Sequence, residues 1–331
     1  MKFSVIGAGG WGTAFARLLA LNEHEVILWV RNRSRAEEID RLRENRRYLP
    51  GVILPREGLR ITESLSEATS SDIIAVAVPS FAMPDLLCQV KGLVAEEEKI
   101  FVNLAKGIDR ESGKSMSELI RSLVSPRAVF TLSGPSHAEE VGRNIPTAIV
   151  LAGTDLDLGK RLQMALATPR FRVYLSADIR GVELCAAVKN VIALATGVSD
   201  GLGYGDNSRG ALITRGLAEM VRFGRVFGAK EKTFFGLSGL GDLVATCTSE
   251  HSRNRRVGYR LGQGESLSGI LESMSMVAEG VYATTIVHEM ALEKGVEMPI
   301  TDAAYRLLYK GADPLALVEE IMTRAPKKEG A

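Results

Sequence analysis

Apolar residues follow two different spacings along the chain. In the first half, short runs rich in β-branched residues predict strands at 2–6, 25–30, 72–78, 99–104, 128–132, 147–152 and 171–175. Segments with helical spacing, such as 13–21 and 115–123, lie between several of these runs. Strands that alternate with helices are typical of a parallel α/β sheet with both faces covered.

The second half of the chain is predicted to be helical. After about residue 176, apolar positions recur at helical spacing over 180–197, 208–227, 254–261, 277–294, 302–309 and 314–324. Segments rich in Gly, Ser and Asp at 199–206 and 236–242 are expected to be loops, and 326–331 a frayed tail. The pattern therefore predicts a doubly wound α/β domain over 1–176 and an all-α domain over 177–331.

Composition and charge limit the classes of partner. The 331 residues suggest about two domains at roughly 150 residues each. Lys and Arg total 41 against 40 for Asp and Glu, a formal net charge of +1. Since no global basic field exists to hold a polyanion, we expect no nucleic-acid partner. Any anion must be recognised by a local site.

Targeting and metal signals are weak. A strand predicted to begin within the first three residues leaves no room for a signal peptide. No run reaches the ~18 apolar residues of a membrane span, and the longest, 182–198, contains Glu183, Lys189 and Asn190. Three cysteines without a C-x-x-C pair favour a reducing, cytoplasmic setting, and the four scattered histidines predict no metal site.

The motif G-A-G-G-W-G places Gly7, Gly9 and Gly12 at the spacing G-x-G-x-x-G. The pattern alone is weak, but here it follows the first predicted strand and opens a helix, as a dinucleotide-binding fold requires. Glycines there allow a tight turn and a close approach of the backbone to a pyrophosphate, which the helix N-terminus stabilises. A plain glycine turn is the alternative. The motif indicates a Rossmann-type sheet that binds NAD(H) or NADP(H).

The end of the second strand bears on the choice of cofactor. Folds that prefer NAD place an acid about 20 residues on, bonded to the ribose hydroxyls. This chain has W-V-R-N-R there, with Arg31 and no acid. A guanidinium grips a 2′-phosphate that an acid would repel. We expect Arg31, with Arg33 beside it, to favour NADP(H); two solvated loop arginines are the alternative.

Further polar residues follow the later strands, at the sheet edge where ligands bind in open α/β folds. Lys106 comes between a buried strand and a glycine, so it is a candidate to contact a cofactor phosphate or a substrate oxygen. The segment S-G-P-S-H-A at 133–138 offers small residues, backbone groups and a hydroxyl against which a ligand can pack.

Lys189 is the strongest anomaly. The helix 182–198 is apolar nearly all round, which predicts that it is buried. At about 100° per residue, Lys189 shares a face with Thr196, and Glu183 shares another with Asn190. Burial lowers the pKa of a lysine and makes it a candidate proton donor. The alternative is a lysine that extends along its own stem to the surface.

A second anion site is predicted in C-T-S-E-H-S-R-N-R-R. Ser252 stands where a helix N-cap is expected, with Arg253 and Asn254 in the first turn, where N–H groups favour a phosphate monoester. Arg255 and Arg256 are expected on a solvated helix face. Asp242, in G-L-G-D, is either an orienting carboxylate or a turn-forming residue.

Taken together, these motifs resemble the soluble NAD(P)-dependent glycerol-3-phosphate dehydrogenases of bacteria, essentially end to end. The matching segments are G-A-G-G-W-G-T-A at 7–14, L-W-V-R at 28–31, N-L-A-K-G at 103–107, S-G-P-S-H-A at 133–138, V-E-L-C-A-A-V-K-N at 182–190, G-D-N-S-R-G-A-L-I-T-R-G at 205–216, F-G-L-S-G-L-G-D-L-V-A-T-C-T-S at 235–249, S-R-N-R-R-V-G at 252–258 and A-E-G-V at 278–281. Ala283, where many relatives have Thr or Ser, is a conservative departure.

The resemblance implies hydride transfer between NAD(P)H and C2 of dihydroxyacetone phosphate, which gives sn-glycerol 3-phosphate for phospholipid synthesis. It implies that Lys189 donates and accepts the proton at the C2 oxygen. The implied substrate contacts are Lys106, Gly134, Ser136, Lys189, Asp242, Ser252, Arg253 and Asn254, with Arg253 near the phosphate. The implied cofactor contacts are Gly7, Gly9, Gly10, Trp11, Gly12, Arg31, Arg33, Tyr48, Lys106, Ala138, Arg253, Val277 and Glu279.

Two other functions stay open. A β-hydroxyacid dehydrogenase shares the two-domain plan but typically has Asn four residues after its lysine, where this chain has Ala193. A non-catalytic NADP-binding sensor would not need Lys189, Lys106 and the 252–254 segment. The apolar helices of the second half are compatible with a homodimer, and no membrane insertion is expected.

Overall fold

The computed structural model describes residues 1–94, 98–274 and 276–325, so the predicted tail 326–331 lies outside it. The chain forms two compact units. The first comprises Met1–Ala186 and Gly228–Asp242, and the second comprises Ala187–Phe227 and Leu243–Ala331.

The first unit is built on an eight-stranded sheet with the order β3-β2-β1-β4-β5-β6-β7-β8. Its strands are β1 (Lys2–Ile6), β2 (Glu25–Trp29), β3 (Leu59–Thr62), β4 (Ile73–Val76), β5 (Ile100–Asn103), β6 (Ala128–Ser133), β7 (Thr147–Gly153) and β8 (Phe171–Ser176). Every neighbouring pair is parallel except β6 and β7. The order changes direction between β1 and β4, which defines the switch point of a doubly wound sheet.

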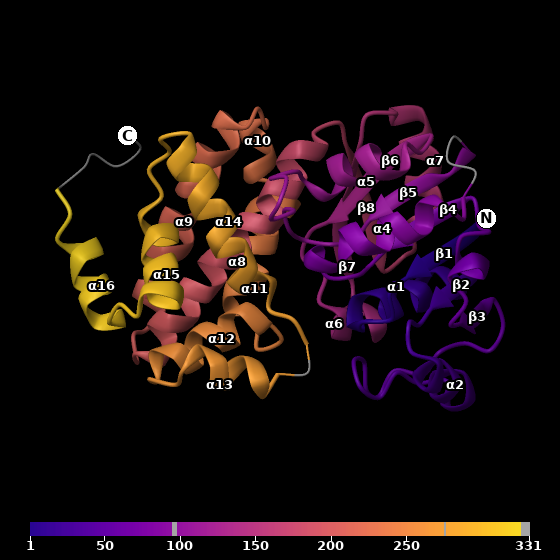
Figure 1. Cartoon of the computed structure of the whole chain (residues 1–331), viewed down its shortest axis with the longest axis horizontal. Coiled ribbons are helices and arrows are strands. Elements are labelled where there is room, and N and C mark those ends of the chain that lie inside the picture. Colours follow the sequence, from indigo (N-terminus) through magenta and orange to yellow (C-terminus); the bar gives the residue numbers. More distant parts are fainter. Residues whose placement is uncertain (95–97, 275, 326–331) are drawn as a thin grey trace. The chain divides into compact units, whose positions relative to one another are not determined.

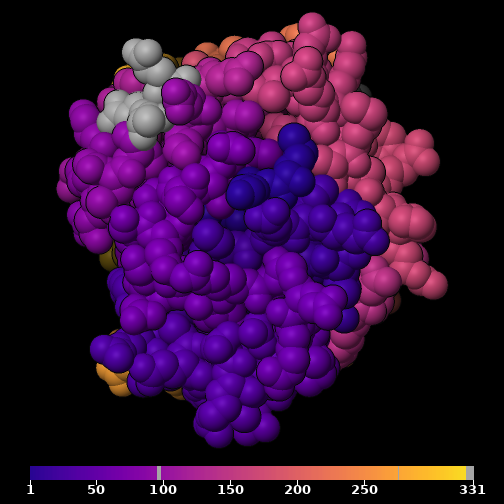
Figure 2. All heavy atoms as spheres, turned by 90° about the vertical axis from the view of Figure 1, so that its right-hand side faces the viewer, coloured from indigo at the N-terminus to yellow at the C-terminus, as the bar shows by residue number. Residues whose placement is uncertain are grey.

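Helices cover both faces of this sheet, as Figure 1 shows. The helices of this unit are α1 (Gly10–Leu21), α2 (Arg33–Leu42), α3 (Leu65–Ala68), α4 (Met83–Lys91), α5 (Met116–Val124), α6 (Ala138–Gly142), α7 (Leu156–Leu166) and α10 (Glu231–Phe234), with the 3₁₀ turn η1 (Ser80–Ala82). Side chains alternate along β4: Ala75 packs in the core under α1 and α7, and Val76 packs in the core under α4 and α5. The predicted Rossmann-type fold is confirmed. Side chains of this unit form most of the face shown in Figure 2.

Two features of the sheet differ from the prediction. β3 was not predicted, because Leu59–Thr62 is only four residues long and includes the exposed Arg60. β7 runs antiparallel to β6, whereas the alternating pattern predicts parallel strands. Only the five-residue helix α6 lies between them, too little for the helical crossover that a parallel pair needs.

The second unit is helical, and no strand is described after Ser176. Its helices are α9 (Asp206–Val226), α12 (Arg253–Gly262), α13 (Leu267–Glu272), α14 (Glu279–Glu293), α15 (Pro299–Lys310) and α16 (Pro314–Met322). Apolar side chains of α8 (Ile179–Gly201), α12, α14 and α15 form one core, with α14 and α15 side by side in Figure 1. The division between the units falls within α8 and at the start of α11 (Asp242–Thr248).

The composition and length of α8 would allow it to cross a membrane, but 94% of its most apolar window is buried inside the protein. It is therefore a core helix, as predicted. The predicted loops are shorter than expected: α8 extends through Gly201, and 236–242 contains the π-helical turn η3 (Leu237–Gly241). Glycine content suggested a loop there, whereas the hydrogen bond from Gly241 N to Gly236 O, at 3.1 Å, continues the helical backbone.

Candidate active site

The turn between β1 and α1 is shaped by its glycines. Gly7 has φ of +116°, a conformation that side chains rarely adopt, and a Cβ on Gly12 would lie 1.9 Å from the Gly7 carbonyl oxygen. A Cβ on Gly9 would meet no atom within 4 Å. The helix N-terminus has no side-chain cap and no acid in its first turn. This open, uncapped turn fits the pyrophosphate of a dinucleotide.

Several predicted cofactor residues surround this turn. A Cβ on Gly10 would lie 2.8 Å from the Tyr48 carbonyl oxygen and 3.4 Å from the Ala138 Cβ. The indole Nε1 of Trp11 is buried without a hydrogen-bond partner among the described residues, so a donor remains available beside the turn. Asn45, which the sequence did not single out, fixes the turn through Nδ2 bonds to the Ala8 carbonyl (3.0 Å) and Thr13 Oγ1 (2.8 Å).

Arg31 and Arg33 follow the carboxyl end of β2. The Gly7 N–H donates to the Trp29 carbonyl at 3.3 Å, which ties the end of β2 to the glycine turn. Both arginines are exposed. Arg33 pairs with Glu37 at 3.0 Å on the first turns of α2, and this pairing raises the pKa of its guanidinium. The 2′-phosphate role of both residues stays a prediction.

A polar cluster forms at the carboxyl ends of β5 and β6. Lys106 Nζ pairs with Asp242 Oδ2 at 2.8 Å and donates to the Gly134 carbonyl at 3.0 Å. That carbonyl also accepts from Ser136 Oγ at 2.9 Å. Four predicted substrate residues therefore lie together in the first unit. Asp242 is buried at 2% exposure and begins α11, so it is an ion-paired carboxylate rather than a turn residue.

Lys189 is buried in the second unit. Its side chain does not extend to the surface: the residue is 3% exposed, and Nζ donates to Thr246 Oγ1 on α11 at 2.6 Å. Thr196, predicted on the same face, contacts the Cys247 sulfur at 3.5 Å. Burial raises the pKa of Cys247 to about 11, so this thiol stays protonated near Lys189. A buried amine that donates to a hydroxyl suits proton exchange.

The first turn of α12 lies beside α8 and α14. Ser252 caps α12 and accepts from Arg255 N at 3.2 Å, as predicted. Asn254 Nδ2 donates to Asn190 Oδ1 at 2.8 Å, and its Oδ1 accepts from Gly280 N at 2.9 Å. The exposed Arg253 donates to the Val277 carbonyl at 2.8 Å, just before Glu279 begins α14. The predicted residues 252–254, Val277 and Glu279 thus form one group.

The expectation for Arg255 was wrong. Its Nε pairs with Asp200 Oδ2 at 2.7 Å, and its side chain is only 22% exposed. Asp200 at the end of α8 also pairs with Arg209 at 2.9 Å. The buried carboxylate draws Arg255 inward, while Arg256 is exposed as expected. Periodicity could not find this partner because Asp200 is distant in sequence.

The site residues form two groups, one within each unit. Four residues that contact these groups and hold them in place were not predicted as site residues from the sequence: Asn45, Thr246, Asn190 and Asp200. Of these, only Asn190 had a signal, since it is a polar residue beside Lys189 on an apolar helix.

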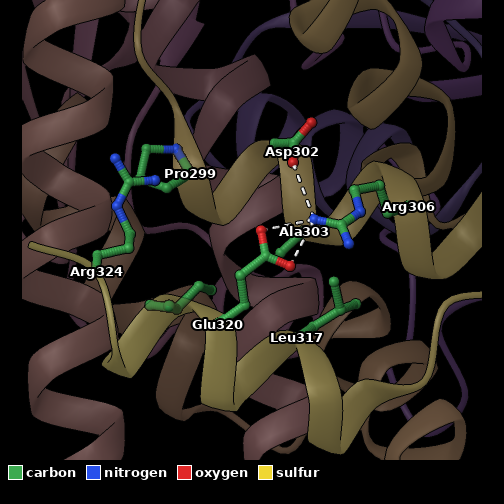
Figure 3. Close-up of a pocket in the computed structure, with 8 residues that line it drawn as sticks. Pro299, Asp302, Ala303, Arg306, Leu317, Glu320 and Arg324 are labelled. Carbon is green, nitrogen blue, oxygen red and sulfur yellow. Dashed lines mark hydrogen bonds and ion pairs between the residues drawn. The ribbon is translucent and has the colours of Figure 1, made fainter.

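A surface pocket at α15 and α16, shown in Figure 3, includes none of the predicted site residues. Arg306 there lies between Glu320 (2.8 Å) and Asp302 (3.7 Å). Arg324 also lines the pocket and pairs with Glu297. Because both arginines are already paired with carboxylates, this pocket does not suit a phosphate.

A Rossmann-type sheet with an open glycine turn, joined to a helical unit with a buried lysine, defines a nucleotide-dependent dehydrogenase. Family models of NAD-dependent glycerol-3-phosphate dehydrogenase match the chain, the N-terminus over residues 2–158 and the C-terminus over 178–319. The chain belongs to this family.

Individual relatives agree. Glycerol-3-phosphate dehydrogenase (NAD(P)+) of Clostridium acetobutylicum is 44% identical, over 98% of this chain and 97% of the relative. The enzyme of that name from a Thermoanaerobacter strain is 47% identical, over 99% of both chains. The crystal structure of glycerol-3-phosphate dehydrogenase from Coxiella burnetii superposes with a TM-score of 0.94 at 40% identity, over 98% of this chain and 99% of that one. The residues matched by the two family models, 2–158 and 178–319, include every predicted site residue.

Proposed function

We propose that this chain interconverts dihydroxyacetone phosphate and sn-glycerol 3-phosphate with NAD(P)H, and so supplies glycerol 3-phosphate for glycerophospholipid synthesis. The observation behind the proposal is the identity of 44–47% to enzymes of this name over nearly the whole chain. Buried Lys189 adds a chemical reason, since a ketone that gains a hydride must also gain a proton.

The cofactor is proposed to bind through two sets of residues. In the first unit these are the turn Gly7, Gly9, Gly10, Trp11 and Gly12, with Arg31, Arg33, Tyr48, Lys106 and Ala138. In the second unit they are Arg253, Val277 and Glu279. When bound, NAD(P)H supplies the hydride for C2, and NAD(P)+ accepts it in the reverse reaction. The uncapped turn at Gly9 offers backbone N–H groups to the pyrophosphate.

Lys189 is proposed as the proton donor to the C2 oxygen in reduction and the acceptor in oxidation. Negative charge that develops on this oxygen is stabilised by a nearby cation as well as by a proton. Lys106, held by Asp242 and the Gly134 carbonyl, is proposed to contact substrate and cofactor.

The substrate phosphate takes no part in the chemistry and supplies binding energy that orients the ketone. Arg253 is proposed to pair with it, together with N–H groups at the start of α12. Ser252, Asn254, Asp242, Gly134 and Ser136 complete the proposed substrate contacts.

We further propose that residues 1–176 form the nucleotide-binding domain and 177–331 the substrate domain, that the enzyme acts in the cytoplasm, and that it forms a homodimer. Three cysteines without a disulfide suit a reducing compartment.

Oxidation of NADPH tests the activity. Purified protein should oxidise NADPH with dihydroxyacetone phosphate and yield sn-glycerol 3-phosphate. A β-hydroxyacid with NADP+ should give no turnover. Turnover of the hydroxyacid alone would identify the other dehydrogenase class, and binding of NADPH without turnover of either would identify a sensor.

A further inference from the structure

Glu183, at the start of α8, is a buried carboxylate that no lysine, arginine or histidine neutralises among the described residues. It is 3% exposed, and four donors surround it. Oε1 accepts from Asn103 Nδ2 (3.0 Å), Ser117 N (2.9 Å) and Thr131 Oγ1 (2.8 Å), and Oε2 accepts from Ser117 Oγ (2.6 Å). Ser117 lies in the first turn of α5, where the helix dipole favours an anion.

Asn103, the last residue of β5, links this carboxylate to the backbone that leads to Lys106. Its Oδ1 accepts from Ala105 N at 2.9 Å, and its Nδ2 donates to the Ala105 carbonyl at 3.2 Å. The carboxamide therefore holds both polar groups of Ala105. Lys106 follows directly and reaches Asp242 and the Gly134 carbonyl.

The orientation of this carboxamide is set by Glu183 together with the two backbone groups of Ala105, and its Nδ2 also donates to Thr131 Oγ1 at 3.4 Å. A carboxylate only accepts hydrogen bonds, so Nδ2 must face it and Oδ1 must face the Ala105 N–H. Without the carboxylate, Nδ2 loses its one charged acceptor, and the carboxamide holds Ala105 less firmly. A misplacement of about 1 Å at a reacting group can cost on the order of 100-fold in rate.

We propose that Glu183 is a positioning residue for Lys106, acting through the Asn103 carboxamide. The inference rests on the proposed function, because that function assigns Lys106 to substrate and cofactor. It requires Glu183 to be more than an anchor for α5 and α8.

Glu219 provides a matched control. It is a second buried glutamate, at 1% exposure, and it likewise accepts from a helix N-terminus and a hydroxyl: Ile300 N at 2.6 Å, Thr301 N at 3.2 Å and Thr301 Oγ1 at 3.1 Å. These residues lie on α9 and α15, outside both groups of site residues. Loss of Glu219 should therefore reproduce the structural cost without the effect on Lys106.

The test compares Glu183→Met, Asn103→Ala, their double variant, Glu183→Gln and Glu219→Met. For each we measure thermal unfolding, kcat and KM for dihydroxyacetone phosphate, and hydrogen exchange at the Ala105 amide. Glutamine retains the acceptor that faces Asn103, whereas methionine keeps only the volume.

We expect Glu183→Met and Asn103→Ala each to lower kcat/KM on the order of tenfold, with faster Ala105 exchange in both. The double variant should lose no more than the worse single variant, because both substitutions break one link. Glu183→Gln should stay near wild type, and Glu219→Met should lower only the unfolding temperature.

Two results would overturn the proposal. One is a double variant in which the two losses of kcat/KM multiply. The other is a folded Glu183→Met variant with unchanged kinetics and unchanged Ala105 exchange. If Glu183→Met does not fold, Asn103→Ala decides: wild-type exchange and kinetics there would also overturn it. Exchange at Ala105 needs no turnover. If the wild-type protein does not turn over dihydroxyacetone phosphate, the proposed function is refuted. The effect of Glu183 on the Ala105 backbone can still be measured by exchange in that case.

Discussion

The buried ammonium of Lys189 is the residue on which the proposed chemistry depends most. Replacing it with methionine preserves most of the volume in the α8 core and removes the proton donor. We expect kcat to fall by at least about 100-fold, in the range of general acid catalysis, with a cooperative unfolding transition retained. Stopped-flow turnover and thermal melts of wild type and Lys189→Met measure both effects, and near-wild-type kcat would exclude Lys189 as the donor.

Arg253 should affect binding rather than turnover. Charged hydrogen bonds contribute about 1.5–3 kcal/mol, so Arg253→Ala should raise KM for dihydroxyacetone phosphate by roughly 10-fold or more and change kcat less. Arg256→Ala is the matched control, since this exposed arginine lies on the same helix. Equal KM values for the two variants would remove Arg253 from the phosphate site.

Arg31 should determine the preference for NADPH. If its guanidinium pairs with the 2′-phosphate, Arg31→Ala should lower kcat/KM for NADPH by about tenfold and leave the value for NADH nearly unchanged. Arg41→Ala, another exposed arginine after β2, should change neither. A constant ratio of NADPH to NADH activity in Arg31→Ala would contradict the assignment.

Single residues also show how far the sequence could predict the site. The sequence identified Lys189 because a charged side chain interrupts an apolar helix. The spacing of apolar residues could not decide whether the lysine side chain is buried or extends to the surface. The structure decides for burial, through Thr246. Asn45 and Asp200 could not be predicted, because their partners come from distant segments and neither residue interrupts a pattern.

Whole elements were predicted correctly where the spacing of apolar residues persists over a long segment, or where strands and helices alternate regularly on either side. The bounds of β1 match the prediction, and α8 was recognised by its length and apolar content. β3 was missed because four residues give almost no alternation to detect. The antiparallel β7 was missed because strand direction depends on the connection through α6, which local spacing does not encode.

Glu219 accepts hydrogen bonds from the N-terminus of α15, and its titration predicts that the stability of the folded protein depends on pH. Burial raises the pKa of Glu219 from 4.5 to about 7, against hydrogen bonds from Ile300 and Thr301 that lower it. Because the folded protein binds this proton more tightly than the unfolded chain, the stabilisation is complete below pH 4.5 and is lost as the pH rises through about 7. The shift corresponds to roughly 3 kcal/mol.

Urea unfolding at pH 5 and pH 8 measures this contribution. The loss of stability between the two values should be smaller in Glu219→Gln than in wild type, since the amide does not titrate. Glu289→Gln, an exposed glutamate on α14, should behave like wild type. Equal pH dependence in all three proteins would show that Glu219 does not titrate in this range.

For the whole molecule, the net charge of +1 predicts no polyanion partner, and it does not show where cationic side chains gather locally. Arg31 in the first unit and Arg253 in the second are each proposed to bind one small phosphate. The family resemblance, drawn from motifs in one order along the chain, is confirmed by relatives that cover nearly all of it. Composition alone could not have distinguished this chain from other two-domain dehydrogenases.

Transfer of deuterium tests the proposed reaction most directly. The protein is incubated with dihydroxyacetone phosphate and NADPH labelled with deuterium at C4 in either stereochemical position, and the product is analysed by mass spectrometry and NMR. One labelled position should deliver deuterium to C2 of sn-glycerol 3-phosphate, with one equivalent of NADP+ formed. Absence of label at C2 from both cofactors, or no glycerol 3-phosphate at all, would contradict the proposed function.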